Sequence, residues 1–178
     1  MADDDLRRIL AEIQRRGGIG PADLDAAISH AEAYAAALPE GCATVVDLGS
    51  GGGLPGVVIA VRRPEVRMLL VERRATRADL LRYAVRALHL VDRVEVTERD
   101  ARDLSGAFEG SVDAVTARSF AAPEVLIPLA ATLLDPGGVL LLSDPPDRTA
   151  RWSAEQLVSW GFGEDGRVEG VRRLRRST

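Results

Sequence analysis

One twelve-residue segment, V-V-D-L-G-S-G-G-G-L-P-G at positions 45–56, constrains what this chain can fold into more than any other part. Its two β-branched residues predict a strand that Asp47 closes, and the glycines that follow are Gly49, Gly51 and Gly53. Glycine lets a backbone approach a ligand closely, and the N-terminus of the helix expected next would direct amide N–H groups at that ligand. The segment therefore predicts a strand, a loop that binds a nucleotide-type cofactor, and a helix.

Two patterns of cofactor loop fit this segment. Residues 51–56 match the dinucleotide fingerprint G-x-G-x-x-G. Residues 47–53 match D-x-G-x-G-x-G, the loop of class I S-adenosylmethionine-dependent methyltransferases. We favour the second, because S-adenosylmethionine has an ammonium group that Asp47 can help hold, whereas pyrophosphate would repel a nearby carboxylate. Ser50 and Leu54 complete the predicted cofactor contacts of the loop. A glycine turn that serves packing alone is the alternative.

Composition fits one globular domain, because the chain has 178 residues and 46% of them are hydrophobic. We expect a helical lead-in at 1–40 and a cofactor-binding α/β core at 41–178. Cys42 is the only cysteine, which excludes an internal disulfide and indicates a reducing compartment. The acidic N-terminus does not resemble a signal peptide, and no apolar run has the length of a membrane span. We therefore expect a cytoplasmic protein that has no membrane partner.

Charge is distributed unevenly along the chain. Residues 1–47 hold nine acidic residues and four arginines, whereas residues 62–93 hold nine arginines and four acidic residues. Residues 172–176 add four more arginines. The net charge of −4 argues against a general nucleic-acid binder, but a local basic face can still attract RNA. A solvated, arginine-rich helix face is the alternative.

Apolar periodicity and turn residues predict helices and strands that alternate after a helical start. Helices are expected at about 6–13, 21–38, 55–63, 76–90, 123–134 and 152–160. Strands are expected at about 43–47, 67–71, 93–97, 112–116 and 138–142, with one or two short strands in 161–176. Asp135-Pro136-Gly137-Gly138 predicts a turn before the fifth strand. This order indicates a Rossmann-like α/β fold with a doubly wound, mostly parallel sheet.

Side chains that follow the predicted strands are candidates for the binding site, because ligands of such sheets lie at the carboxyl ends of the strands. Glu72 follows the second strand, where its carboxylate can accept hydrogen bonds from both ribose hydroxyls, and Arg73 is next to it. Asp100, after the third strand, can accept the adenine amino group, and the backbone of Ala101 can meet the ring; an ordinary polar loop is the alternative. Arg118 follows the fourth strand, at the edge of the expected pocket.

Other catalytic signatures are missing from the sequence. No cluster of His, Cys and acidic residues has metal-ligand spacing, and His30 and His89 stand alone on predicted helices. Ser50 does not lie in a G-x-S-x-G nucleophile motif. Asp144-Pro145-Pro146 is similar to the D-P-P-[YF] motif of amino-group methyltransferases, but it follows the fifth strand instead of the fourth and lacks the aromatic residue.

Together, residues 47–56, Glu72 and the run R-S-F-A at 118–121 resemble the glucose-inhibited division protein B family. L-P-G directly after the glycine loop is the most specific part of this resemblance, which covers roughly residues 28–143. The family has a histidine before its loop, and His30 lies near that place. The resemblance implies an S-adenosylmethionine-dependent methyltransferase that modifies N7 of a guanine in small-subunit ribosomal RNA. The ribosomal RNA or the small ribosomal subunit is then the partner.

The chain also departs from the family pattern. An Asp-Ser pair usually follows the family's histidine, where this chain has A-E-A-Y at 31–34, and both terminal regions are shorter here. The family's fifth strand commonly ends in Leu-Lys-Gly, whereas this chain has Leu142-Ser143-Asp144. A methyltransferase of a small molecule or protein therefore stays open, as does a protein that binds S-adenosylmethionine without catalysis. A nicotinamide dehydrogenase is disfavoured by Asp47.

The implied reaction needs positioning more than acid–base chemistry, because guanine N7 has a lone pair and loses no proton when it is methylated. Arg118 is the predicted catalytic residue, which would position the cofactor or the target base. Arginines of 62–93 or of 172–176 are expected to hold phosphates. A base within a helix must first be exposed or flipped.

Overall fold

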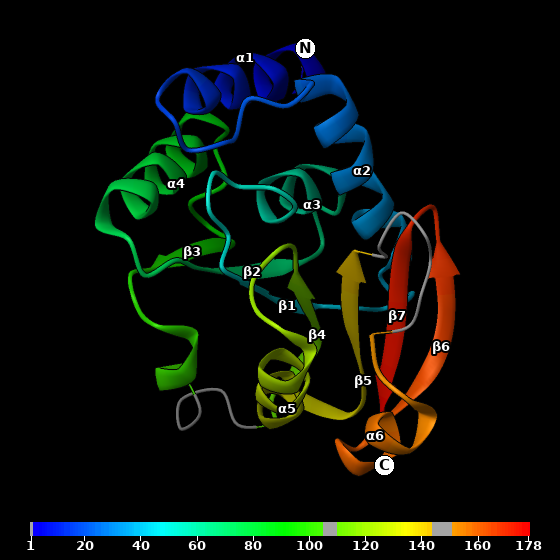
Figure 1. Ribbon diagram of the computed structural model, residues 1–178. Coiled ribbons are helices and arrows are strands. Elements are labelled where there is room, and N and C mark those ends of the chain that lie inside the picture. The colour runs from blue at the N-terminus through cyan, green and yellow to red at the C-terminus, as the bar shows by residue number, and fades with distance from the viewer. Residues whose placement is uncertain (1, 105–109, 144–150) are drawn as a thin grey trace.

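A seven-stranded sheet with the strand order β3-β2-β1-β4-β5-β7-β6 occupies the centre of the fold. The computed structural model describes residues 2–104, 110–143 and 151–178 (Figure 1). The strands are β1 (Thr44–Leu48), β2 (Arg67–Val71), β3 (Val94–Thr97), β4 (Val112–Ala117), β5 (Leu134–Ser143), β6 (Phe162–Val168) and β7 (Val171–Arg176). The first five pair in parallel, whereas β7 pairs antiparallel with β5 and with β6. The predicted Rossmann-like α/β fold with a mostly parallel sheet is confirmed.

Helices cover both faces of this sheet (Figure 1). On one face lie α1 (Ala2–Arg15), α2 (Leu24–Ala37), α3 (Gly56–Arg62) and α4 (Ala75–Ala87). On the other face lie α5 (Pro123–Leu133), α6 (Ala154–Ser159) and the short 3-10 helix η1 (Ala101–Leu104). The sheet is thus doubly wound, which is the arrangement that places ligands at the carboxyl ends of the strands.

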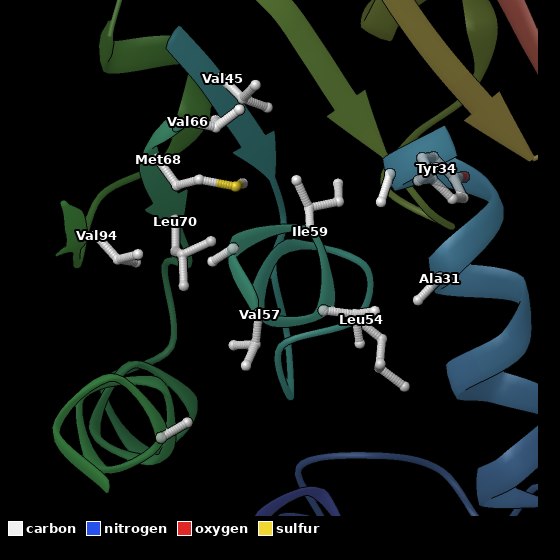
Figure 2. Close-up of a cluster of buried hydrophobic side chains, with 14 of the residues drawn as sticks. Ala31, Tyr34, Val45, Leu54, Val57, Ile59, Val66, Met68, Leu70 and Val94 are labelled. Carbon is white, nitrogen blue, oxygen red and sulfur yellow. The ribbon is translucent and has the colours of Figure 1, made fainter. Parts of the chain in front are cut away.

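Side chains along each central strand alternate between two hydrophobic cores. Val45 of β1 and Leu70 of β2 pack with the helices α1–α4, as Figure 2 shows. Their neighbours Val46 and Leu69 pack with α5 and η1 on the opposite face. Because both faces are buried, these strands are apolar runs instead of alternating polar and apolar ones. This explains why the apolar runs V-V and M-L-L-V predict strands from the sequence alone.

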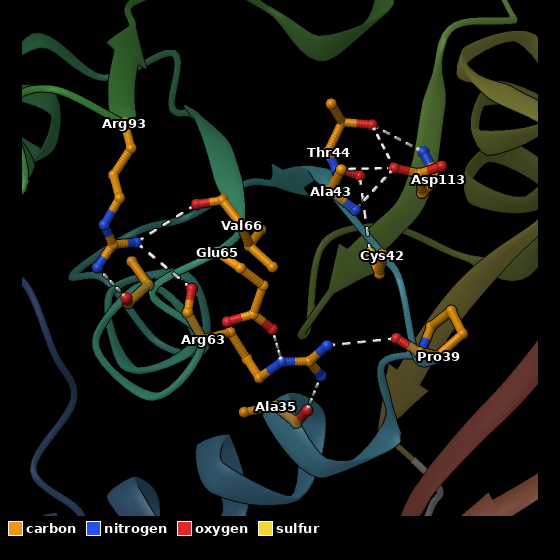
Figure 3. A network of polar contacts seen from close by, with 11 residues as sticks. Ala35, Pro39, Cys42, Ala43, Thr44, Arg63, Glu65, Val66, Arg93 and Asp113 are labelled. Carbon is orange, nitrogen blue, oxygen red and sulfur yellow. Dashed lines mark hydrogen bonds and ion pairs between the residues drawn. The ribbon is translucent and has the colours of Figure 1, made fainter.

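The amino-terminal edge of the sheet is held together by polar contacts (Figure 3). Arg63 donates to the carbonyl of Ala35 at 3.0 Å and pairs with Glu65. Arg93 donates to the carbonyl of Val66 at 3.3 Å. Asp113 Oδ2 accepts the backbone N–H of Thr44 at 2.8 Å. Two arginines of the basic stretch 62–93 therefore tie loops together at the edge opposite the expected site.

The structure differs from the sequence prediction at 135–138, where a turn was expected. The chain there belongs to β5, which begins at Leu134, and the pairing with β4 shifts register between Val112 and Ala114. In place of the turn the pairing has an irregularity, in which the four residues 135–138, with Gly137 at φ +81°, lie opposite the single residue Asp113. The peptide bond Leu54–Pro55 is cis. In the described ranges, no helix combines the length and apolar character that crossing a bilayer requires.

Candidate functional site

A cavity of about 300 Å³ lies at the carboxyl ends of β1 to β4. The residues that line it come from the ends of these strands, from the loops after them, and from the starts of α4 and η1: Gly49, Val71, Glu72, Arg73, Arg74, Arg77, Arg99, Asp100, Ala101, Arg102, Ser119 and Phe120. The predicted site residues in this lining are Gly49, Glu72, Arg73, Asp100 and Ala101. The remaining predicted residues, which are Asp47, Ser50, Gly51, Gly53, Leu54 and Arg118, lie outside it. The structure thus brings together about half of the predicted site around one cavity.

The glycine loop forms the wall of this cavity at Gly49. All three alternating glycines have positive φ, at +69° for Gly49, +55° for Gly51 and +100° for Gly53. A Cβ on Gly49 would also lie 2.7 Å from the ring of Phe120, so side chains are excluded there by conformation and by space. Ser50 is buried, and its hydroxyl donates to the carbonyl of Asp47 at 2.9 Å. The loop is therefore held by its own hydrogen bonds and packing, without a ligand.

The connection between α1 and α2 closes the outer side of the loop. A Cβ on Gly52 would lie 2.6 Å from the carbonyl oxygen of Gly18 and 2.5 Å from the side chain of Ile19. Leu54, predicted as a cofactor contact, is buried among the helices of the first core (Figure 2). The loop is therefore covered at Gly52, while Gly49 lines the cavity.

Glu72 ends β2 with a buried carboxylate that two backbone amides hold. Its Oε2 accepts the N–H of Gly51 at 3.1 Å, and its Oε1 accepts the N–H of Arg74 at 2.9 Å. Only 6% of the residue is exposed, although it lines the cavity. Each carboxylate oxygen can accept a further hydrogen bond. Glu72 is therefore a hydrogen-bond acceptor that is fixed beside the glycine loop and lines the cavity.

Asp47 lies beneath the loop, with 1% of its surface exposed. Its Oδ1 accepts the hydroxyl of Thr116 at 2.7 Å, while Oδ2 has no hydrogen-bond partner among the described residues. Burial raises the pKa of this carboxyl, and the Thr116 bond and the charge of Arg118 oppose that rise only in part. Asp47 thus supports the loop and carries an unused acceptor, but it does not line the cavity.

The loop after β3 supplies the opposite wall of the cavity. Asp100 accepts the backbone N–H of Arg102 at 3.0 Å and its guanidinium at 2.7 Å, which holds the pKa of the carboxyl well below its usual range. An adenine amino group would have to share these oxygens with Arg102. Ala101 is buried in the lining, and Arg73 lies 4.0 Å from Asp100. The two residues predicted to contact adenine thus line the cavity, and Asp100 already has a partner in Arg102.

Arg118 lies beside a polar cluster that the sequence analysis did not predict. His30 and Tyr34 of α2 both contact the hydroxyl of Ser143 at the end of β5, His30 through Nε2 at 3.1 Å and Tyr34 through its OH at 2.8 Å. Tyr34 also donates to the carbonyl of Ala117 at 3.1 Å. Burial and the charge of Arg118 lower the pKa of His30. The sequence predicts a lone His30. In the structure His30 instead has a partner, and together with Tyr34 it joins α2 to the ends of β4 and β5.

The sequence did contain a signal for this cluster. His30 and Tyr34 are four residues apart, so they share one face of a helix and can meet a single partner. Their partner, Ser143, is one of the residues that replace the family's Leu-Lys-Gly pattern. The motif considered next to it, Asp144-Pro145-Pro146, lies outside the residues that the structure describes.

Three of the arginines that line the cavity have no acidic partner in the part of the chain that the structure describes. Within the described residues, no acidic side chain pairs with Arg74, Arg77 or Arg99. Several of the other arginines predicted to hold phosphates are paired with acidic side chains. Arg62 pairs with Glu32, Arg173 and Arg175 both pair with Asp165, and Arg172 is 2% exposed and pairs with Glu164. Positive charge that is available to a ligand therefore gathers at the cavity and not at the C-terminal strand.

Comparison with known proteins identifies relatives by sequence. Residues 27–148 match the GidB family, rRNA small subunit methyltransferase G. The ribosomal RNA small subunit methyltransferase G of Acidothermus cellulolyticus is 42% identical over 130 residues, which cover 71% of this chain and 56% of that protein. The chain spans about half the length of the curated relatives it matches, with 56%, 51% and 46% of the first three covered.

Solved structures with low sequence identity show the same fold. An S-adenosylmethionine-dependent O-methyltransferase from Thermotoga maritima superposes with a TM-score of 0.68 at 18% identity, and covers 96% of this chain and 71% of that chain. TYW2 of P. horikoshii, solved in complex with MeSAdo, gives a TM-score of 0.64 at 17% identity, over 89% of this chain and 62% of that chain.

Proposed function

The chain belongs to the GidB family, rRNA small subunit methyltransferase G, and on that premise we propose that it is an S-adenosylmethionine-dependent methyltransferase whose acceptor is N7 of a guanine in small-subunit ribosomal RNA. The observation that carries this proposal is the cavity beside the glycine loop, where two backbone amides fix Glu72 as a hydrogen-bond acceptor. The curated relatives are named for methylation of small-subunit ribosomal RNA, which supports the acceptor class.

Glu72 would bind the ribose of the cofactor. Its carboxylate is oriented by the amides of Gly51 and Arg74, and it keeps acceptor capacity toward the cavity. A carboxylate suits two adjacent hydroxyls, because each hydroxyl can donate to one oxygen. Gly49 would allow the cofactor to approach the backbone, and Asp100 with Ala101 would meet the adenine. Arg73 would lie at the rim, while Asp47, Ser50, Gly53 and Leu54 would support the loop from behind.

The residues of the site suit transfer to a lone pair. S-adenosylmethionine, when bound, supplies the methyl group from its sulfonium. Attack by guanine N7 releases no proton, so the site needs orientation more than a general base. Arg118 lies after β4, next to the cavity residues Ser119 and Phe120, where its guanidinium can orient the target base. Arg118 is thus the proposed catalytic residue.

Phosphates of the RNA would be held by the cavity arginines Arg74, Arg77 and Arg99. These side chains have no acidic partner among the described residues, so an incoming phosphate need not displace one. Arginine binds phosphate oxygens through its planar fork of donors. Arg173 and Arg175, which share Asp165, are in our proposal structural instead.

We further propose that residues 1–178 act as one class I methyltransferase domain, with 1–40 as a helical lead-in on the core 41–178. The contact of Gly52 with Gly18 and Ile19 supports this, because it couples the lead-in to the glycine loop. A small-subunit ribosomal RNA acceptor would place the activity in the cytoplasm.

Transfer of labelled methyl groups tests the proposal. The protein would be incubated with methyl-labelled S-adenosylmethionine and with small-subunit ribosomal RNA, free or in the ribosomal subunit, and N7-methylguanosine would be mapped by cleavage at the modified base. Label at one guanine is the expected result. Label on protein or small molecules alone would favour the other acceptor classes. Binding of S-adenosylmethionine with no transfer to any acceptor would indicate a cofactor-binding protein without catalysis.

A further inference from the structure

The hydrogen bonds around Ser143 fix where the proton of His30 lies. Tyr34 has one hydroxyl proton, and the carbonyl of Ala117 can only accept, so Tyr34 donates to Ala117. The contact of 2.8 Å between Tyr34 and Ser143 is then a hydrogen bond only if Ser143 donates. Because Ser143 donates its single hydroxyl proton to Tyr34, it can only accept in its contact with His30 Nε2 at 3.1 Å. His30 therefore carries its proton on Nε2.

This assignment leaves Nδ1 of His30 as an acceptor. The ring is kept neutral because its partial burial and the charge of Arg118 lower its pKa. No described residue bonds Nδ1, and the atom is not among the buried polar atoms that lack a partner. The side chain is half-buried and at the end of β5, the edge of the sheet that also carries the cavity. His30 thus presents one acceptor at the end of β5, on the same helix face as Tyr34, which bonds the carbonyl of Ala117, the residue before Arg118.

A donor beside an acceptor distinguishes guanine from adenine. Guanine carries an oxygen acceptor at position 6 and an N–H donor at position 1, whereas adenine has an amino donor at 6 and an acceptor at 1. We propose that His30 is a specificity-determining residue, whose Nδ1 accepts the N1–H of the target guanine while Arg118 donates to O6. The proposal rests on the proposed function, since it assigns a recognition role toward that acceptor.

The order of the groups along the sheet agrees with the order of atoms on the base. Strands β2, β1, β4 and β5 are neighbours, and their ends carry Glu72, the glycine loop, Arg118 and Ser143 with His30. On guanine, N7, O6 and N1–H follow one another along one side of the ring system. With N7 toward the cofactor, O6 would therefore meet Arg118 and N1–H would meet His30. A base extruded from its stack is commonly read at this edge.

Base analogues at the mapped acceptor position test this inference. Small-subunit ribosomal RNA would be ligated with guanosine, inosine or 2,6-diaminopurine at that position. Inosine keeps O6 and N1–H, whereas 2,6-diaminopurine replaces them with an amino group and a bare N1. We expect the wild-type protein to methylate guanosine and inosine RNA with similar kcat/KM, and diaminopurine RNA at least about tenfold less well.

Variants of the cluster separate recognition from structure. His30→Ala should reduce the preference for guanosine over diaminopurine by about tenfold and leave the Kd of S-adenosylmethionine unchanged, and His30→Gln, which offers an amide oxygen, should restore part of the preference. Ser143→Ala keeps the histidine but removes the acceptor that holds its proton on Nε2. The proton can then lie on either nitrogen, so the preference for guanosine should also fall. The matched control is His89→Asn, which changes the chain's other histidine, exposed beyond the far end of α4.

The outcomes distinguish this inference from the function on which it rests. A guanosine preference that is the same in His30→Ala, Ser143→Ala and wild type would overturn the role of His30 while methylation of guanine stands. Absence of transfer to guanosine RNA by the wild-type protein would overturn the proposed function itself, and the inference with it.

Discussion

The backbone N–H of Gly51 donates a 3.1 Å hydrogen bond to the carboxylate of Glu72, 21 residues further along the chain. The contact links the loop after β1 to the end of β2, so loop and acceptor are positioned by each other. A buried carboxylate that faces a cavity and is held by backbone amides is costly to place without a ligand role. This pair is therefore the centre of the proposed cofactor site.

Glu72→Gln should weaken binding of S-adenosylmethionine by about tenfold to a hundredfold, because a hydrogen bond to a charged acceptor contributes roughly 1.5–3 kcal/mol. The amide has the size of the carboxylate, but its NH2 group cannot accept the N–H of Gly51 or Arg74, so urea unfolding is measured alongside to separate a loss of loop stability from a loss of binding. Isothermal titration calorimetry measures the Kd, and Glu40→Gln, exposed in the turn before β1, is the control. An unchanged Kd in Glu72→Gln would remove the residue from the cofactor site.

Gly49→Ala should lower the free energy of unfolding by about 1–3 kcal/mol, because its Cβ meets the ring of Phe120 at 2.7 Å in a positive-φ conformation. Gly41→Ala is a matched control, since Gly41 has φ +75° but nothing within 4 Å of a Cβ. Urea unfolding followed by circular dichroism gives both values. Equal losses in the two variants would mean that the Phe120 contact is unimportant.

Asp47→Asn should change how stability depends on pH. Burial raises the pKa of Asp47 above its unfolded value of 3.8, so the folded state holds the proton more tightly than the unfolded state. The stabilisation from that proton is complete below the unfolded pKa and is lost as pH rises through the folded pKa. Relative to Asp47→Asn, the wild type should therefore lose stability as pH rises from 3.8. Parallel urea unfolding curves of both proteins across this range would contradict the assignment.

Arg118→Ala should reduce kcat/KM for methyl transfer to RNA by about fivefold to a hundredfold, since one good contact from arginine to a base edge contributes roughly 1–3 kcal/mol. The Kd of S-adenosylmethionine should change much less, because Arg118 is not in the cavity lining. Arg86→Ala, exposed in the last turn of α4, is the control. A larger effect on cofactor binding than on turnover would assign Arg118 to the cofactor instead.

Substitution of Arg74, Arg77 and Arg99 by alanine should weaken RNA binding and reduce its salt dependence. Each lost phosphate contact should lower the slope of log K against log salt by about 0.7 for a single strand to 0.9 for a duplex. Arg175→Ala is the control, because that arginine pairs with Asp165 and donates to the Gly137 carbonyl. Filter binding at several salt concentrations provides the slopes. Equal slopes in the triple variant and in wild type would place the RNA elsewhere.

The strands and the cofactor loop were predictable because both depend on local sequence. V-V-D-L and M-L-L-V are apolar on both faces, as parallel strands covered by helices must be, and the glycines require positive φ wherever the loop lies. The position of Glu72 at the cavity was predictable because it directly follows a strand, and ligands of such sheets lie at the carboxyl ends of the strands.

Contacts between distant segments were not predictable in this way. Ser143 lies 113 residues from His30, and only the order of strands and the placement of α2 bring them together. The arginines of 62–93 and 172–176 look alike in sequence, yet Arg93 and Arg172 are structural while Arg77 faces the cavity. The sequence at 135–138 predicts a turn because the irregular segment inside β5 also needs a glycine at positive φ.

Calorimetric titration with S-adenosylmethionine, and in parallel with NADH, is the most direct test of the central claim that this cavity binds the methyl donor. The account predicts micromolar binding of S-adenosylmethionine that Glu72→Gln weakens, and no measurable binding of NADH. Absence of S-adenosylmethionine binding to the wild-type protein, or binding of NADH in its place, would contradict it.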